Sequence, residues 1–269
     1  MQRLKNLTKR ILKIHPKSNL TPLRDIIQLG TKVHGYFIPE NFLNSSSLCY
    51  CVGAGEDISF DTELVHHFGC DVVILDPAPE GINHFNLLKS KIENHESLSL
   101  NNLETKFTYR IKKDQLSKLK FIELGVWTEA TMIKFYKPNI GDYYVSHSIE
   151  LFKEHGEYIE VPVDRLSNIM KSQGHTSIDL LKLEIEGAEY KVIETIVEDK
   201  LDIKMILVEY DEVYHCKGLD YLKRIKKSSE LLLDNGYKIA HSTDMFKRLF
   251  VRNDVFEQIS AQEKAKKRA

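Results

Sequence analysis

The chain has 269 residues, 42% of them hydrophobic and 29% charged, and its net charge is −1. This is ordinary globular composition, at a length that suits one large α/β domain or two small ones. The near-zero net charge argues against a nucleic-acid-binding protein, and no apolar run approaches the length of a membrane span.

The N-terminal segment Met1–Lys17 contains six Lys or Arg residues and no acid. Its residues Leu4, Leu7, Ile11 and Ile14 fall on one stripe, which predicts a basic amphipathic helix. We expect this helix to dock on the protein with its charges in solvent, and weak contact with a membrane surface is the alternative. Because the N-terminus lacks the apolar region and cleavage site of a secretory signal, we predict a cytoplasmic protein.

The cysteines fit that location. Cys49 and Cys51 alternate along an apparent strand and share one face, whereas Cys70 and Cys216 are isolated. Since the chain has no C-x-x-C pair, neither a zinc site nor a redox motif is supported, and we expect buried free thiols.

Three regions are expected along the chain. Residues 1–43 form an N-terminal helical extension, in which Thr21–Gly30 is a second short helix and Tyr36–Leu43 is a loop. Residues 44–253 form the main domain, and residues 254–269 form a basic C-terminal tail that is frayed and solvated at its end.

Strand and helix patterns alternate through the main domain. Short apolar runs predict five core strands, over Leu48–Val52, Val72–Leu75, Phe121–Leu124, Ile178–Ile185 and Lys204–Val208. Helical spacing predicts helices over Ile58–Phe68, Ile82–Ile92, Ala188–Val197 and Leu219–Leu233. Alternating runs predict antiparallel strands over Thr131–Tyr136, Tyr158–Val163, Tyr237–Ala240 and Phe246–Val251, and residues 94–117 read as an irregular connection. This order indicates a doubly wound, mostly parallel α/β sheet, whose ligand site lies at the carboxyl ends of the strands.

A glycine loop, with Gly53, Gly55 and Asp57, follows the first core strand. Glycine permits a tight turn and lets a ligand approach the backbone, although an ordinary strand–helix turn is the alternative. The dinucleotide fingerprint needs a third glycine at position 58, where this chain has Ile58. NAD and FAD are therefore disfavoured, whereas S-adenosylmethionine carries no pyrophosphate and makes no such demand.

Two further strand ends carry candidate cofactor contacts. Asp76 ends the second strand and can accept hydrogen bonds from ribose hydroxyl groups, or it can instead cap a turn before Pro77. Gly125, Val126 and Trp127 follow the third strand, where they could flank an adenine ring or pack in the core.

The fourth strand ends in the charged run D-L-L-K-L-E-I-E-G-A-E. Lys182, Glu184 and Glu186 share one face by strand alternation, and such groups in a buried layer must be paired or functional. The alternative is a salt-bridged cluster around Lys182, which Glu209 and Asp211 could join. Several carboxylates could also hold a divalent metal, but no spacing demands one.

His147 lies between two serines in an irregular stretch and could act as a general base near neutral pH. A loop histidine of this kind is more often simply solvated, and His215 is treated with the same caution.

Four stretches of the chain resemble the FkbM-type methyltransferases: Cys49–Phe60, Asp76–Pro79, Val145–Ile149 and Asp179–Glu189. The resemblance extends from about Pro39 to Val251, and the Asp179–Glu189 run is its most specific part. The family usually has aspartate where this chain has Glu184, which keeps the charge but moves it by one methylene.

The resemblance implies a Rossmann-like class I fold with a seven-stranded, mostly parallel sheet and a C-terminal antiparallel strand. It also implies S-adenosylmethionine as cofactor and O-methylation of a sugar or small metabolite. Residues Gly53, Gly55 and Asp57 would hold the methionine part and Asp76 the ribose. Residues 125–127 would flank adenine, and the acids at 184 and 186 would lie near the methyl group.

We hypothesise that Glu186 or His147 removes the acceptor proton, with Lys182 as a further catalytic candidate at the same strand end. The predicted acceptor is a small molecule or a glycan, and no nucleic acid. Two other interpretations stay open, a nicotinamide-dependent oxidoreductase and a non-catalytic module that binds the cofactor.

Overall fold

The computed structural model describes residues 19–101, 106–136, 158–210, 220–243 and 246–266. The expected basic helix over residues 1–17 lies outside them. The predicted helix over Thr21–Gly30 and the loop over Tyr36–Leu43 are wrong, because these segments contain strands β1 (Ile26–Leu29) and β2 (Tyr36–Pro39), which pair antiparallel. Tertiary pairing overrides the local helical spacing here.

A seven-stranded sheet forms the centre of the molecule, in the order β13-β14-β12-β11-β3-β4-β7. Every neighbouring pair is parallel except the two that involve β14, which runs antiparallel to both β12 and β13. This confirms the predicted mostly parallel sheet with an antiparallel strand near the C-terminus. The strands are β3 (Leu48–Val52), β4 (Asp71–Leu75), β7 (Leu119–Ile122), β11 (Ser177–Leu183), β12 (Asp202–Glu209), β13 (Tyr237–Ser242) and β14 (Lys247–Arg252).

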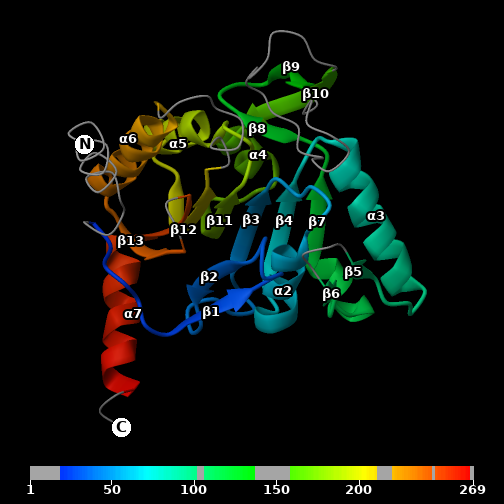
Figure 1. Cartoon of the computed structure of the whole chain (residues 1–269), viewed down its shortest axis with the longest axis horizontal. Helices are drawn as coiled ribbons and strands as arrows, with labels where there is room; N and C mark the ends of the chain where they lie inside the picture. Colours follow the sequence, from blue (N-terminus) through cyan, green and yellow to red (C-terminus); the bar gives the residue numbers. More distant parts are fainter. Residues whose placement is uncertain (1–18, 102–105, 137–157, 211–219, 244–245, 267–269) are drawn as a thin grey trace, which may run out of the picture.

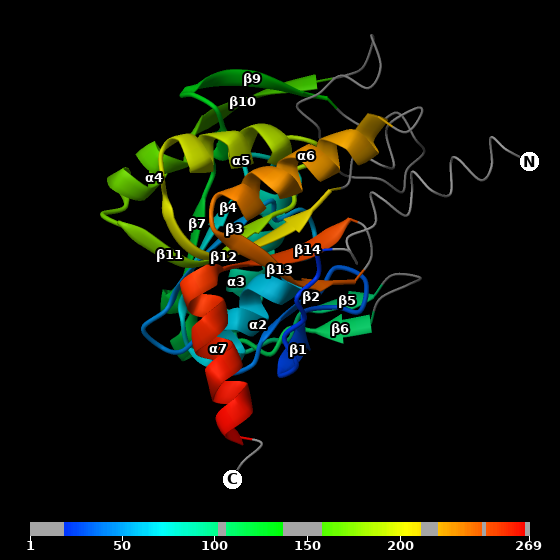
Figure 2. The ribbon, with the colours of Figure 1, turned by 90° about the vertical axis from the view of Figure 1, so that its left-hand side faces the viewer.

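Helices cover both faces of this sheet (Figures 1 and 2). One face packs under α2 (Ser59–Phe68), α3 (Pro79–Glu93) and α7 (Asn253–Lys266), together with the β1–β2 hairpin. The other face packs under α4 (Leu166–Ser172), α5 (Glu189–Glu198) and α6 (Asp220–Asp234). The sheet therefore separates two apolar cores, as the doubly wound pattern predicts.

The C-terminal region is not the expected tail. Residues 253–266 form α7, because Val255, Phe256 and Ile259 recur at helical spacing and are buried against the sheet. At the other end of the described chain, Thr21 N–H and Leu23 N–H donate to the carbonyl groups of Ile239 and Ala240, which ties the hairpin segment to β13.

Two smaller sheets complete the fold. Within the predicted irregular connection, β5 (Ser99–Asn101) and β6 (Lys106–Thr108) pair antiparallel, and a 3₁₀-helix η2 (Lys113–Lys118) follows. The strands β8 (Gly125–Trp127), β9 (Thr131–Tyr136) and β10 (Tyr158–Arg165) form a separate sheet. Figure 1 shows this sheet above the ends toward which the arrows of β3, β4 and β7 point.

Cys49, Cys51 and Cys70 are buried free thiols, as predicted, whereas Cys216 lies outside the described residues. Across the described ranges, no helix combines the length and the apolar character that a membrane span requires.

Candidate functional site

The glycine loop uses its two glycines for different purposes. A Cβ atom on Gly53, which has φ of 88°, would lie 1.9 Å from the carbonyl oxygen of Glu184. Gly55 also has a positive φ, of 51°, but a Cβ atom there would meet nothing within 4 Å. Gly53 therefore permits close packing of β3 against the end of β11, and Gly55 borders open space that a ligand could use.

Asp57 connects this loop to two neighbours. Its Oδ1 accepts a hydrogen bond from Ser59 N–H at 2.9 Å, at the first residue of α2. Its Oδ2 accepts one from Thr31 Oγ1 at 3.0 Å, in the β1–β2 connection. Asp57 therefore holds the β1–β2 connection against the glycine loop. Its contact with the methionine part of the cofactor stays a prediction.

Asp76 binds backbone N–H groups of the glycine loop and of its own turn. Its Oδ2 accepts hydrogen bonds from Ala54 N–H at 2.8 Å and Gly55 N–H at 3.0 Å. Its Oδ1 accepts from Ala78 N–H at 2.8 Å, which is the turn-capping contact left open by the sequence. Oδ1 can accept a further bond, whereas Oδ2 already accepts two, so a ribose contact stays a prediction. Asp76 holds the loop in shape in either case.

The Gly125–Trp127 segment follows the core strand β7, as predicted, and forms a short strand of its own, β8. Val126 is 2% exposed and packs in the α5-side apolar core, which favours the core-packing alternative for this residue. A Cβ atom on Gly125 would lie 3.2 Å from Pro77 Cγ, so β8 passes beside the Asp76 turn. Contact of Gly125 and Trp127 with adenine stays a prediction.

Lys182 is buried at the end of β11 and makes three electrostatic contacts. Its Nζ donates to Gly53 O at 3.0 Å, pairs with Glu184 Oε2 at 2.9 Å and lies 3.8 Å from Asp61 Oδ2 in α2. Strand alternation places Lys182 and Glu184 on one face, as predicted. The salt-bridged cluster is thus real, and it also joins β11 to the glycine loop.

The hydroxyl group of Tyr36, in β2, lies between two carboxyl groups from neighbouring strands. It is 2.8 Å from Glu184 Oε2 and 2.7 Å from Glu209 Oε2. Glu209 also pairs with Lys247 at 2.6 Å, and Lys247 is its register partner in β14. The predicted participation of Glu209 is confirmed, whereas Asp211 lies outside the described residues.

The charges in this cluster shift one another's pKa values. Burial alone would lower the pKa of Lys182, but the Asp61 and Glu184 carboxylates raise it above its ordinary value. Burial opposes ionisation of Glu184, yet Lys182 and Lys247 lower its pKa. Burial and the neighbouring Glu184 charge raise the pKa of Glu209, against the influence of Lys247. Glu184 is therefore the more readily ionised of the two glutamates.

Glu186 does not share the strand face predicted for it. β11 ends at Leu183, and Glu186 has a positive φ of 54°, which a non-glycine residue seldom adopts. Glu189 holds this turn, because its carboxylate oxygens accept the N–H groups of Ile185 at 2.7 Å and Gly187 at 2.9 Å. Burial raises the pKa of Glu189 to about 8.

Sequence reasoning missed four residues of this region: Tyr36, Asp61, Glu189 and Lys247. Glu189 lies in the charged run, and its position two residues after a glycine is a local signal, because an acid there can bind backbone N–H groups. Nothing local marks the other three.

His147 and His215 lie outside the described residues, so no contact is assigned to either histidine. Among the described residues, no group of three or more His, Cys, Asp and Glu side chains is arranged to hold a metal ion.

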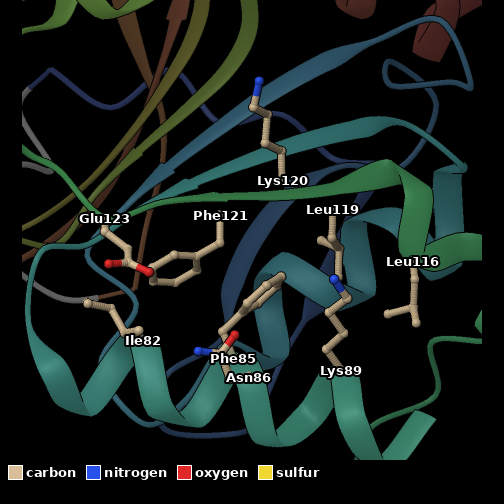
Figure 3. A pocket seen from close by; sticks show the side chains of 9 residues that line it. All are labelled: Ile82, Phe85, Asn86, Lys89, Leu116, Leu119, Lys120, Phe121 and Glu123. Atoms are coloured by element: carbon tan, nitrogen blue, oxygen red, sulfur yellow. The ribbon is translucent and has the colours of Figure 1, made fainter. Parts of the chain in front are cut away.

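A groove of about 290 Å³ opens elsewhere, between α3 and β7 (Figure 3). It is lined by Ile82, Phe85, Asn86, Lys89, Leu116, Leu119, Lys120, Phe121 and Glu123. None of the predicted site residues lines this groove, and we assign it no role.

Comparisons with known proteins agree with the resemblance seen in the sequence. The family model described as the methyltransferase FkbM domain matches residues 51–239. A search of curated proteins returns no match. Two similar solved structures are a Methanococcus jannaschii fibrillarin, a pre-rRNA processing protein, and a precorrin-6y C5,15-methyltransferase from Geobacter metallireducens. The first is 13% identical, with a TM-score of 0.41 over 83% of this chain and 71% of that chain. The second is 12% identical, with a TM-score of 0.40 over 79% and 82%.

Proposed function

Because the chain belongs to the FkbM-type family of S-adenosylmethionine-dependent methyltransferases, we propose that it methylates a hydroxyl group of a sugar or another small metabolite. The cofactor is S-adenosylmethionine, which supplies an electrophilic methyl group on a sulfonium centre. Gly55 borders open space, and the anionic Glu184 lies beside the same loop, so the residues present fit a cationic cofactor of this kind.

The position of Glu184 supports methyl transfer to oxygen. Its side chain is 21% exposed, its Oε2 is held by Lys182 and Tyr36, and its Oε1 lies on the side of the partly exposed His34, 4.0 Å from Nδ1. An alcohol becomes a good nucleophile only as its proton leaves, so a carboxylate at the carboxyl edge of the sheet meets the main chemical requirement. Glu186 and His147 remain the candidates for the base that come from the sequence, and Glu184 is a third.

The chain's part in the reaction is alignment and removal of a proton. The acceptor oxygen forms a bond to the methyl carbon while the S–C bond breaks and its electron pair stays on sulfur. The acceptor proton passes to the base, so charge and atoms balance. Lys182 positions this edge, because one ammonium group binds both the glycine loop and Glu184.

The test is direct detection of a methyl ether. Purified protein is incubated with isotope-labelled S-adenosylmethionine and a panel of monosaccharides, nucleotide sugars, polyols and phenols, and products are identified by mass spectrometry and NMR. We expect a labelled O-methyl product, with turnover reduced at least tenfold in Glu184→Gln and unchanged in Glu257→Gln, an exposed glutamate on α7. A labelled N- or C-methyl product would contradict the proposal. Cofactor binding without transfer to any acceptor would favour the non-catalytic module.

A further inference from the structure

The contacts of Tyr36 require more protons than its hydroxyl group can supply. Glu184 Oε2 and Glu209 Oε2 lie 2.8 Å and 2.7 Å from the same phenol oxygen. Distances this short between oxygens are hydrogen-bond distances, and each needs a proton between the two atoms. A tyrosine hydroxyl carries one proton and donates it to one acceptor at a time. The other contact is therefore completed by a proton that belongs to the carboxyl groups.

Charged groups from every neighbouring element surround this pair. Glu184 faces Lys182 on its own strand and His34 before β2, with Lys247 of β14 and Asp61 of α2 also acting on it. Glu209 faces Lys247 and, through Tyr36, Glu184. The two lysine ammonium groups also lie over the Tyr36 ring, Lys247 at 4.7 Å and Lys182 at 5.6 Å from its centroid.

The hairpin that carries Tyr36 is held firmly against the site. Tyr36 itself is 2% exposed and packs edge-on against Phe60 of α2, with ring centroids 5.0 Å apart. Lys247 Nζ donates to Val33 O at 2.9 Å, and Thr31 is bound to Asp57. Tyr36 and Lys247 both lie outside residues 51–239, which the family model matches. The site thus depends on segments that flank the matched domain.

We propose that Tyr36 is a positioning residue that lets Glu184 and Glu209 hold one shared proton, and that this pair stores the proton released by the acceptor. This inference rests on the methyl transfer to a hydroxyl group proposed above. As the methyl group leaves, the positive charge on sulfur disappears, and nearby carboxylates then bind a proton more tightly. In the S-adenosylmethionine complex, the sulfonium charge favours the form in which both carboxyl groups are ionised. The proton from the acceptor passes to Glu184. Carried on Oε2, it is donated to the Tyr36 oxygen while the Tyr36 hydroxyl group donates to Glu209 Oε2, so the total charge of the site and its ligands is conserved.

The test needs no acceptor, because S-adenosylmethionine and S-adenosylhomocysteine differ in this charge. Calorimetric titration of each compound, in buffers of different ionisation enthalpy, gives the number of protons exchanged on binding. In the wild-type protein we expect the S-adenosylhomocysteine complex to hold up to one proton more than the S-adenosylmethionine complex. The affinity ratio that favours S-adenosylmethionine should then rise with pH, by up to tenfold per pH unit.

Tyr36→Phe and Glu209→Gln should each remove at least half of that difference. Tyr50→Phe is the matched control, because Tyr50 is a buried tyrosine whose hydroxyl bonds His175, and it should keep the wild-type value. The ligands' own ionisation contributes equally in every protein, so the change between proteins carries the result. A wild-type difference retained in both Tyr36→Phe and Glu209→Gln would overturn the proposal. If Tyr36→Phe does not fold, Glu209→Gln decides.

This result is independent of the search for a methyl ether. A methyl ether product together with unchanged proton numbers in the variants overturns the role of Tyr36 and leaves the proposed function intact. Proton numbers that change as expected, with methyl transfer only to nitrogen or carbon, overturn the proposed function. Glu184 and Glu209 would then still share a proton, but that proton would not come from an acceptor hydroxyl group.

Discussion

Two kinds of carboxylate lie at the same edge of the sheet. Asp76 and Glu189 are held by backbone N–H groups, three for Asp76 and two for Glu189. Glu184 and Glu209 are held instead by side chains, through Tyr36 and the lysines beside them. The first pair shapes the loops, and the second pair lies where β11 and β12 end and β14 begins.

The difference decides what each group can do. Backbone N–H groups only donate, so a carboxyl group bound by several of them cannot be replaced by a donor without loss. A tyrosine hydroxyl both donates and accepts, so one of the two carboxyl groups beside it can be protonated or ionised and still form a hydrogen bond with it. We therefore expect the backbone-bound acids to control folding and the acids bound by side chains to control protonation.

The largest effect is expected at Gly53. Its carbonyl oxygen accepts from Lys182, and the N–H groups of the next two residues donate to Asp76. In Gly53→Ala the new Cβ atom would lie 1.9 Å from Glu184 O at a positive φ, so the free energy of unfolding should fall by about 3 kcal/mol or more. Gly55 also has a positive φ but borders open space, so Gly55→Ala should lose only about 1 kcal/mol. Its methyl group should instead weaken S-adenosylhomocysteine binding. Denaturant unfolding and calorimetry measure both, and equal destabilisation would contradict the distinction.

Asp76→Asn should have the next largest effect. An amide offers one acceptor oxygen and an NH₂ group, so at least one buried N–H group of the loop loses its partner, and stability should fall by about 2 kcal/mol. Asp71→Asn, at the exposed start of the same strand, removes a pairing with Lys118 and should change stability by less than about 1 kcal/mol. Similar losses in both variants would show that the backbone contacts of Asp76 do not hold the loop.

Glu189 should make stability depend on pH. Its folded-state pKa of about 8 lies above the ordinary value of 4.5, so the folded protein keeps a proton that the unfolded chain has lost. The unfolded chain binds fewer protons in this range, and this contribution to stability is therefore lost as the pH rises from about 5 to about 8. Glu189→Gln cannot ionise, so its melting temperature should fall less over this range. An identical pH slope in both proteins would contradict the expectation.

Glu209→Gln should have the smallest effect on stability. The amide oxygen can still accept from Tyr36 and from Lys247, and Glu209 already has a raised pKa, so the free energy of unfolding should change by about 1 kcal/mol. This is the same chemical change as Asp76→Asn, made on a carboxyl group that side chains hold. If Glu209→Gln destabilises the protein as much as Asp76→Asn, the contrast between the two kinds of carboxylate fails.

Much of the fold was predictable because its signals are local. Short apolar runs marked the five parallel strands from β3 to β12, and helical spacing placed α2, α3, α5 and α6. The helix α2 ends where Gly69 adopts a left-handed conformation and donates to Val65 O, as a C-terminal glycine predicts. Errors lay at the ends of the chain, where β1, β2 and α7 are set by pairing and packing with the sheet. Inside the chain, the sequence also missed α4 and the short strands β5 and β6.

The residues of the candidate site fall into the same two groups, those that local sequence patterns predict and those that tertiary contacts bring together. The sequence by itself determined the glycine loop, the acid at the end of β4, and the pairing of Lys182 with Glu184, because strand alternation and strand ends are local properties. Only the tertiary structure brought Tyr36 to Glu184 and Glu209, across 148 and 173 residues. It also turned Glu186 away from the strand face, through the bonds that Glu189 makes to the backbone. Contacts of this kind depend on which segments meet at the sheet edge, and no local pattern encodes that meeting.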